Sequence, residues 1–336
     1  MSPFNWNDAT VLVTGGAGFI GSHTCRKLLE LGASVISLDN YNCIYTPDMK
    51  HDNMRRLQED FGQRVVDLHA DIADRRQFEA ALAPYADRIN AVVHLAALTS
   101  VFDSTDKPDE YVNVNVNATQ HIADWMKDHD IRKMVFASSS SVYGYRNTAP
   151  FFETDGVSKP SSVYAATKIM CENLLHTYAG LYNMHVVALR FFNIYGPAQP
   201  PSLVIHKFAE QIFNKQPVTV YGDGSFQRDY TYVGDATNAI AQALAYDKAN
   251  YDVFNIGTCE IYSVLDIIRH LEEKLGMPAN VTHLPQPPGD VPLTHADTSK
   301  AQTELGYKTT KSFNDGIAEF VDWFLSYHNA LQETVS

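Results

Sequence analysis

The sequence contains 336 residues, of which 45% are hydrophobic and 19% charged, and its formal net charge is −13. A chain of this length can build one large α/β domain and a smaller lobe around a substantial core. The negative charge argues against a nucleic-acid partner, because phosphate backbones are bound by basic surfaces. No run of about 18 apolar residues is present, so we expect no membrane partner.

The cysteines and histidines carry no metal-site pattern. Cys25, Cys43, Cys171 and Cys259 are widely scattered, without a C-x-x-C pair. No H-E-x-x-H motif accompanies the 13 histidines, so we predict no metal. The opening nine residues lack the basic flank and apolar run of a secretory signal. These features together predict a cytoplasmic protein.

Short apolar, β-branched runs alternate with helix-like stretches through the first 190 residues. The expected strands are 10–14, 34–39, 65–70, 91–95, 134–138 and 185–190, and helical spacing covers 20–31, 111–127 and 161–178. This alternation predicts an α/β fold with a Rossmann-like, doubly wound parallel sheet. Ligands of such a sheet bind at the carboxyl ends of its strands, so functional residues are expected just after each strand.

The later part of the chain is less regular. Three prolines between Gly196 and Pro201 mark the end of the regular sheet. We expect a Rossmann domain over 1–193, joined by 229–258, and a smaller C-terminal substrate-binding lobe made of 194–228 and 259–330. Residues 217–224 and 285–292 are turn-rich, whereas 313–328 returns to helical spacing.

A glycine-rich turn, GGAGFIG at residues 15–21, joins the first expected strand to the first helix. The backbone must turn at Gly15, approach a pyrophosphate at Gly18 and pack against the strand at Gly21. Taken alone, the motif also fits a tight turn without a ligand. Asp39 ends the second strand, where a carboxylate accepts from both ribose hydroxyls and repels a 2′-phosphate. The combination predicts that the Rossmann domain binds NAD rather than NADP.

Tyr164 and Lys168 are four residues apart on an expected helix, so their side chains share one face. Such a pair is often an ordinary surface feature. Here the helix follows a strand that ends in Ser138 and Ser139, which brings a third hydroxyl toward the same sheet edge.

Six segments of the chain match the motifs of a known family: TGGAGFIG, HLAA, SSSSVYG, YAATK, RFFNIYG and RDYTYVGD. They stand in the order seen in extended short-chain dehydrogenases/reductases, which the chain resembles over nearly its whole length. Within that family it is similar to nucleotide-sugar 4-epimerases. The stretches SSVYAATK and LPQPPGDVPLTHAD are most similar to the UDP-glucuronate 4-epimerases.

The resemblance implies an NAD-dependent C4-epimerase of a UDP-sugar, with Ser139, Tyr164 and Lys168 as its catalytic group. Tyr164 would take the proton from the sugar O4 while the hydride leaves C4, and Ser139 would hydrogen-bond the same oxygen. An ordinary tyrosine has a pKa of about 10, so a neighbouring Lys⁺ and the nicotinamide cation must favour the phenolate. Lys168 is suited to that task and to binding the nicotinamide ribose.

Further contacts are implied residue by residue, and without the resemblance most of these positions would be interpreted as core. The cofactor contacts are Gly15, Gly18, Phe19, Ile20, Gly21, Asp39, Asn40, Asp71, Ile72, Leu95, Ala96, Ala97, Asn115, Tyr164, Lys168 and Phe192. The substrate contacts are Ser140, Ser141, Asn193, Arg228, Tyr230 and Asp290. An arginine fork suits a diphosphate, although an Arg beside an Asp is more often a solvated ion pair.

Two neighbouring positions favour epimerisation over related reactions. The 4,6-dehydratases carry an Asp-Glu pair after the catalytic hydroxyl, and the UDP-glucuronate decarboxylases carry a Glu there. This chain has Ser140 and Ser141 instead. A dehydratase or reductase remains an alternative, as does a catalytically silent NAD-binding sensor or scaffold.

The sugar is left open by departures from the family pattern. Pro200 replaces an arginine that lies near the sugar carboxylate in glucuronate epimerases, and Pro287 replaces an arginine that binds the diphosphate in UDP-glucose epimerases. UDP-glucuronate, UDP-glucose and, because Thr294 is of modest size, N-acetylated sugars all remain candidates. The helices at 111–127 and 161–178 match a dimer interface of the family and predict a homodimer, although amphipathic helices can also be wholly internal.

Overall fold

The computed structural model describes residues 4–42, 47–146, 148–285 and 291–335. Seven strands of the described chain form one parallel sheet in the order β11-β6-β5-β4-β1-β2-β3. The order runs outward in both directions from β1 and β4, which makes the sheet doubly wound. The strands are β1 (Thr10–Thr14), β2 (Ser34–Asp39), β3 (Val65–His69), β4 (Ala91–His94), β5 (Lys133–Ser139), β6 (His185–Phe191) and β11 (Tyr251–Ile256).

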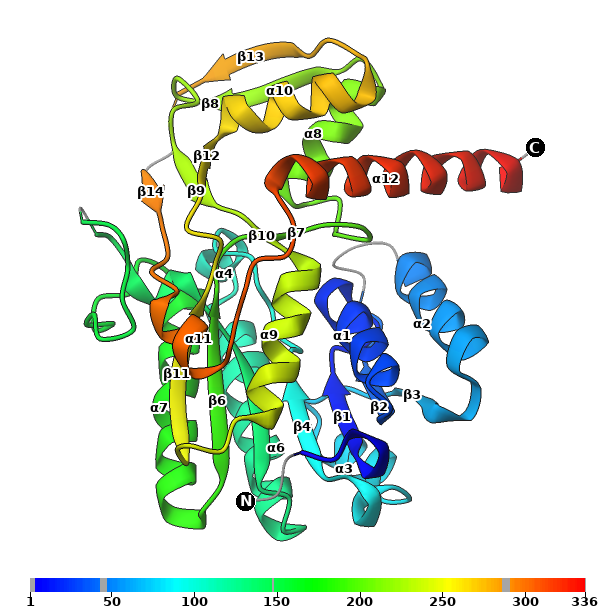
Figure 1. The fold of residues 1–336 in the computed structure, drawn as a ribbon, viewed down its shortest axis with the longest axis vertical. Helices are drawn as coiled ribbons and strands as arrows, with labels where there is room; N and C mark the ends of the chain where they lie inside the picture. The colour runs from blue at the N-terminus through cyan, green and yellow to red at the C-terminus, as the bar shows by residue number, and fades with distance from the viewer. Residues whose placement is uncertain (1–3, 43–46, 147, 286–290, 336) are drawn as a thin grey trace.

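Helices cover both faces of this sheet, because its strands are apolar on both sides. Along β1, Val11 and Val13 pack under one layer of helices, whereas Leu12 packs under the other. The first layer is α1 (Phe19–Glu30), α2 (Pro47–Phe61) and α9 (Val233–Ala245), with α9 beside α1 in Figure 1. The second is α3 (Arg75–Leu82), α6 (Ala118–Asp128) and α7 (Val163–Tyr182). The predicted fold class is confirmed.

The six expected strands are all present, each within one residue of its expected ends. The expected helix at 111–127 is interrupted, which the sequence pattern did not predict. A short helix, α5 (Pro108–Tyr111), leads into a π-helical turn at Val112–Asn117, and α6 follows. Asn115 within this turn is buried and hydrogen-bonds the backbone of Leu98 through both its amide oxygen, at 2.8 Å, and its amide nitrogen, at 3.0 Å. Widened turns of this kind recur at functional sites.

Beyond β6 the chain builds a lobe above the carboxyl ends of the strands (Figure 1). Its small sheets are β7 (Ile194–Tyr195) with β10 (Thr231–Tyr232), β8 (Pro217–Tyr221) with β13 (Asn280–Leu284), and β9 (Gln227–Asp229) with β12 (Ile261–Ser263) and β14 (Leu293–Thr294). Its helices are α8 (Val204–Phe213), α10 (Val264–Leu275) and α12 (Phe313–Val335). These helices share one apolar core.

Two details differ from the expectation for this lobe. Residues 217–221 form strand β8 instead of a turn, because Val218 and Val220 are wholly buried on one side of it. Ala301, in α11 (Ser299–Glu304), and Tyr307 pack into the sheet's core, so part of 259–330 belongs against the sheet. The division of the chain into two domains otherwise stays a prediction.

The remaining α-helix of the described residues is α4 (Asp103–Asp106). Among the described residues, no helix combines the length and apolar content needed to cross a bilayer. Nor do these residues bring three His, Cys, Asp or Glu side chains together in a group that could hold a metal ion.

Candidate active site

The glycine turn lies at the switch point of the sheet, between β1 and β4. Gly15 has a φ of +71°, and its N–H donates to Leu38 O at 2.7 Å. A Cβ on Gly15 would lie 2.9 Å from Ala96 N, and one on Gly21 would lie 2.0 Å from Gly15 O. Both positions therefore require glycine, as the sequence predicted. Gly18 caps α1, whose first-turn N–H groups point out of the helix toward the strand ends.

The wall opposite this turn is formed at the end of β4 by Leu95, Ala96 and Ala97, which are all partly buried. Ala96 N donates to Thr14 Oγ1 at 3.3 Å, which ties this wall to the end of β1. In α1, Phe19 is buried and Ile20 half-buried. The predicted pyrophosphate contacts thus gather around one narrow turn.

The predicted adenosine contacts gather at the ends of β2 and β3. Asp39 is 5% exposed, and its Oδ1 accepts from Tyr41 N at 2.8 Å and from Lys50 Nζ at 3.0 Å. Asn40 Nδ2 donates to Asp71 Oδ2 at 3.2 Å, and Ile72 is buried beside them. The first three of these side chains can therefore present polar atoms to one nucleoside.

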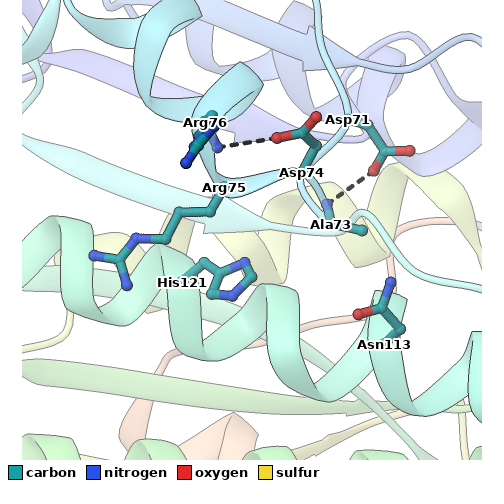
Figure 2. Close-up of a pocket in the computed structure, with 7 residues that line it drawn as sticks. All are labelled: Asp71, Ala73, Asp74, Arg75, Arg76, Asn113 and His121. Carbon is teal, nitrogen blue, oxygen red and sulfur yellow. Dashed lines mark hydrogen bonds between the residues drawn. The ribbon is translucent and has the colours of Figure 1, made fainter.

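Asp71 also lines an open hollow of about 580 Å³ on the outer side of this group (Figure 2). Asp74 and Arg75 come from the start of α3, while Asn113 and His121 come from the π-turn and α6. Asp74 caps α3 by accepting from Arg76 N and Gln77 N. None of the predicted catalytic residues lines this hollow, so it is not where the chemistry would occur.

The predicted catalytic group meets at the carboxyl end of β5. Ser139 is the last residue of that strand, and its Oγ lies 3.0 Å from Ser141 Oγ. Tyr164 stands in the first turn of α7. Ser162 caps this helix, and its side chain accepts from Ala165 N at 3.1 Å. Lys168, one turn further, donates from Nζ to Ala137 O at 2.8 Å, with Nζ 5.9 Å from the centre of the Tyr164 ring. Strand β5 and helix α7 therefore position all three side chains.

Burial sets the charge states of this group. Desolvation raises the pKa of Tyr164 to about 12, and the hydrogen bond with Ser139 counteracts part of that rise. Desolvation also lowers the pKa of Lys168 to about 8, with the negative charge of Glu172 acting in the opposite direction. Burial thus favours the protonated phenol of Tyr164, so formation of the phenolate requires nearby positive charge, which Lys168 and a bound nicotinamide cation would supply.

A buried ion pair that the sequence analysis did not predict connects the catalytic helix to the neighbouring strand of the sheet. Glu172 lies one turn after Lys168, and its oxygens accept from Arg190 Nε at 2.9 Å and Nη2 at 2.7 Å. Ser138 Oγ donates to the same carboxylate at 2.6 Å. Both charged side chains are about 95% buried, at 6% and 5% exposure. A bidentate pair in this position fixes β5, β6 and α7 relative to one another.

A second buried network reaches the catalytic helix from the π-turn. Asn115 Nδ2 donates to Thr167 Oγ1 at 3.0 Å, and that hydroxyl donates to Tyr164 O at 2.7 Å. Thr119 Oγ1 donates to Asn115 O at 2.5 Å and contacts His94 Nε2 at 3.0 Å. Asn115, predicted as a cofactor contact, is therefore tied into the protein by its own side chain, and its contact with the cofactor stays a prediction.

The predicted substrate residues are distributed between the sheet edge and the lobe. Ser140 and Ser141 begin the short helical turn after β5. Asn193 is exposed just after β6, and Arg228 is half-buried on β9, where it pairs in register with Thr294 of β14. Ser140, Ser141 and Asn193 thus follow two neighbouring strands of the sheet, whereas Arg228 belongs to the lobe, and their contacts with substrate stay predictions. Asp290 and Pro287 lie outside the described residues.

Two other predicted contacts are mostly internal. Tyr230 is 5% exposed, and its ring packs against Phe313, with centroids 5.7 Å apart. Phe192 is wholly buried in a cluster with Tyr143 and Phe151. Their contacts with substrate and nicotinamide stay predictions, and their packing alone accounts for their apolar character.

Asp229, which the sequence did not single out, joins three parts of the lobe. Its carboxylate accepts from Thr258 N at 2.8 Å, Cys259 N at 3.1 Å and Ala296 N at 3.1 Å. It is wholly buried next to Arg228, so it fixes the segments on either side of the predicted diphosphate contact. The sequence signal, an Asp after an Arg, had suggested only a surface ion pair.

The residues present fit a dinucleotide. The turn at Gly15 and Gly21 leaves room that a Cβ would fill, the first turn of α1 presents N–H groups, and Asp39 offers a carboxylate at the next strand end. The catalytic hydroxyls lie at the neighbouring strand end.

Comparison with known proteins agrees with this arrangement. A family model described as GDP-mannose 4,6 dehydratase matches residues 12–320. The chain belongs to this family. UDP-glucuronate 4-epimerase 4 from Arabidopsis thaliana is 36% identical over 96% of the chain and 77% of that protein. The membership predicted from the motifs, among NAD-dependent epimerases and dehydratases, is confirmed.

Solved structures give the same result. UDP-glucuronic acid 4-epimerase from Bacillus cereus in complex with UDP-glucuronic acid and NAD is 34% identical, with a TM-score of 0.86, covering 95% of this chain and 99% of that one. UDP-glucose 4-epimerase from Thermotoga maritima with UDP-glucose is 30% identical, with a TM-score of 0.85, covering 95% and 99%.

Proposed function

We propose that this protein is an NAD-dependent UDP-sugar 4-epimerase, and that its principal substrates are UDP-glucuronate and UDP-galacturonate. The observation that carries the proposal is the meeting of Ser139, Tyr164 and Lys168 at the end of β5, beside a glycine turn built for a dinucleotide. Similarity to epimerases that bind UDP-glucuronate and NAD supports the choice of sugar and cofactor.

The chain's own residues divide the work of C4 inversion. Bound NAD would supply an acceptor, and then a donor, for the C4 hydride. Tyr164 removes the O4 proton as C4 is oxidised to a ketone, and returns it when C4 is reduced on the opposite face. Ser139 hydrogen-bonds O4 throughout, and Lys168 supplies the positive charge that stabilises the phenolate. Because oxidation and reduction balance, no external reductant is consumed.

The residues after the catalytic serine support epimerisation over elimination. Dehydration and decarboxylation need an additional carboxylate near the catalytic hydroxyl, and Ser140 and Ser141 offer only hydroxyls. The name of the matching family model includes a dehydratase, but this chain lacks that acid pair.

A neutral sugar is the second candidate, because Pro200 stands where a cationic partner for the uronate is expected. Placing a carboxylate in a site without such a partner is costly. UDP-glucuronate then relies on hydroxyl donors such as Ser140 and Ser141, whereas UDP-glucose needs no charged partner.

The test incubates the purified protein separately with UDP-glucuronate, UDP-glucose and UDP-N-acetylglucosamine, and measures the C4 configuration by proton NMR. We expect inversion of UDP-glucuronate without added reductant. If only UDP-glucose is inverted, the protein is still a 4-epimerase, but its substrate is UDP-glucose instead of UDP-glucuronate. If none of the three sugars is inverted while NAD stays bound, the proposed substrate is wrong, and the protein either acts on another sugar nucleotide or is a binding protein.

We also propose a homodimer in the cytoplasm. Val112, at the start of the π-turn, and Met170, on α7, expose apolar side chains at 37% and 48% on the two helical segments expected to form the interface. Sedimentation at low protein concentration tests this: a mass of one chain, 37.5 kDa, would contradict it.

A further inference from the structure

A buried lysine contacts the carboxylate predicted to bind the adenosine ribose. Lys50, in the first turns of α2, is 6% exposed in its side chain, and its Nζ lies 3.0 Å from Asp39 Oδ1. The same ammonium donates to Asn42 Oδ1 at 3.0 Å. Lysines are almost never buried unless they are paired, so these contacts define a specific position for the charge.

The two hydrogen bonds donated to Asp39 involve only one of its two carboxylate oxygens. Lys50 Nζ and Tyr41 N both donate to Oδ1. From the described residues, the Asp39 carboxylate accepts these two hydrogen bonds. Its other oxygen, Oδ2, can then accept from a ribose hydroxyl. Lys50 thus fixes the orientation of the acceptor.

The helix that carries Lys50 is itself attached to the pyrophosphate turn. Asn53, one turn further along α2, donates from Nδ2 to Ala17 O at 3.0 Å. A shift of α2 would therefore move Lys50 and the glycine turn together. This attachment keeps the ammonium at the second strand end, where the 2′ position of the adenosine ribose would lie.

The pair changes the physical basis of cofactor choice. Asp39 and Lys50 are together neutral, so charge repulsion of a 2′-phosphate is weaker than a lone carboxylate would give. The remaining basis for discrimination against NADP is hydrogen bonding. The Asp39 carboxylate already binds the Lys50 ammonium, and it can only accept hydrogen bonds, so it has no proton to donate to a phosphate. If Asp39 were replaced by a neutral side chain, Lys50 would become a phosphate ligand.

We propose that Lys50 is a specificity-determining residue: it orients Asp39 for the ribose of NAD, and it is a latent ligand for the 2′-phosphate of NADP. This inference rests on the proposed function only in that it takes the cofactor to be a nicotinamide dinucleotide. It predicts that the effects of substitutions at the two positions are not additive.

The test measures NAD and NADP binding by calorimetry on protein freed of copurified cofactor. We expect Asp39→Ser to bind NADP about tenfold to a hundredfold more tightly than the unsubstituted protein does, the range typical of one hydrogen bond between charged groups. The double variant Asp39→Ser/Lys50→Met should lose that gain, whereas Asp39→Ser/Lys50→Arg should keep it. Lys50→Met alone should weaken NAD about tenfold without improving NADP.

Lys248→Met is the matched control, because Lys248 forms an exposed ion pair with Glu304. It should change neither affinity, and thermal unfolding of every variant verifies that it is folded. Asp39→Asn, which keeps the shape of the side chain, replaces Asp39→Ser if the latter does not fold. The inference is overturned if NADP affinity is unchanged by the loss of Asp39, or if its gain survives Lys50→Met.

Its failure is distinguishable from failure of the proposed function. Protein that binds NAD but inverts no sugar contradicts the epimerase alone, since the Lys50 comparison needs only binding. Protein that binds neither dinucleotide overturns both.

Discussion

Replacing Lys168 with Met should move the pH dependence of epimerisation instead of merely lowering its rate. Lys168 Nζ is 5.9 Å from the centre of the Tyr164 ring, and both residues are buried. With an effective dielectric constant of about 20, an ammonium and a phenolate whose charges lie about 6 Å apart attract each other by about 2.8 kcal/mol. This corresponds to roughly two pKa units on the tyrosine.

The direction of the pH shift depends on which protonation state of Tyr164 the positive charge of Lys168 stabilises. Lys⁺ stabilises the phenolate, so its removal raises the pKa of Tyr164, and the base is then available only at higher pH. The acidic side of the kcat profile should therefore shift upward by about two pH units in Lys168→Met. The pKa of Lys168 is lowered to about 8, so the unsubstituted protein should lose activity above that pH, a decline that Lys168→Met lacks.

The assay follows C4 inversion of UDP-glucuronate by NMR from pH 5.5 to 10, with NAD saturating. Lys168→Arg is the control, because it keeps a positive charge that does not titrate in this range. A uniform loss of kcat with an unchanged profile would refute the electrostatic role and leave only ribose binding to Lys168.

Three further substitutions test other parts of the site. Tyr164→Phe should abolish epimerisation while NAD remains extractable from the purified protein, since the ring still packs but its oxygen is gone; near-normal turnover would exclude the mechanism. Glu172→Gln should lower the free energy of unfolding by about 3–5 kcal/mol in urea titrations, because it leaves Arg190 charged and buried, and Glu172→Gln/Arg190→Met should recover most of it. If the double variant is no more stable than the single one, the buried charge is not the cause. Asp229→Asn should raise KM for the UDP-sugar with NAD affinity unchanged, because it weakens the acceptor that joins three loop segments; an equal loss of NAD binding would contradict this assignment.

Local sequence pattern was sufficient for most of the fold. Strands such as β1 combine β-branched residues with a glycine turn, and this combination determines both the strand and its exit. The shared helix face of Tyr164 and Lys168 was also predictable, because their spacing is set by the helix itself, but their catalytic role was implied by the family resemblance and stays a prediction. These features depend on residues close together in the chain.

The parts that were missed depend on distant contacts. Glu172 and Arg190 are 18 residues apart, and only the packing of α7 against β6 brings them together. The π-turn arises because Asn115 reaches the backbone of Leu98 on a neighbouring loop, which helical periodicity does not encode. Lys50 was not singled out in the sequence, because only the placement of α2 brings its Nζ to Asp39 at the end of β2.

The interleaving of sheet and lobe sets the order in which a newly made chain can fold. Strand β11 completes the sheet beside β6, yet the ribosome makes it only after α8, β8 and β9 of the lobe. The apolar core of the lobe needs α12, whose buried residues Ile317, Phe320 and Phe324 are made after the other helices and strands of the lobe. During synthesis, β6 therefore has an unpaired edge until β11 is made, and α8 has an incompletely covered apolar face until α12 is made. A chain at this stage exposes an unpaired strand edge and an apolar helix face, the two features that make partly folded chains aggregate.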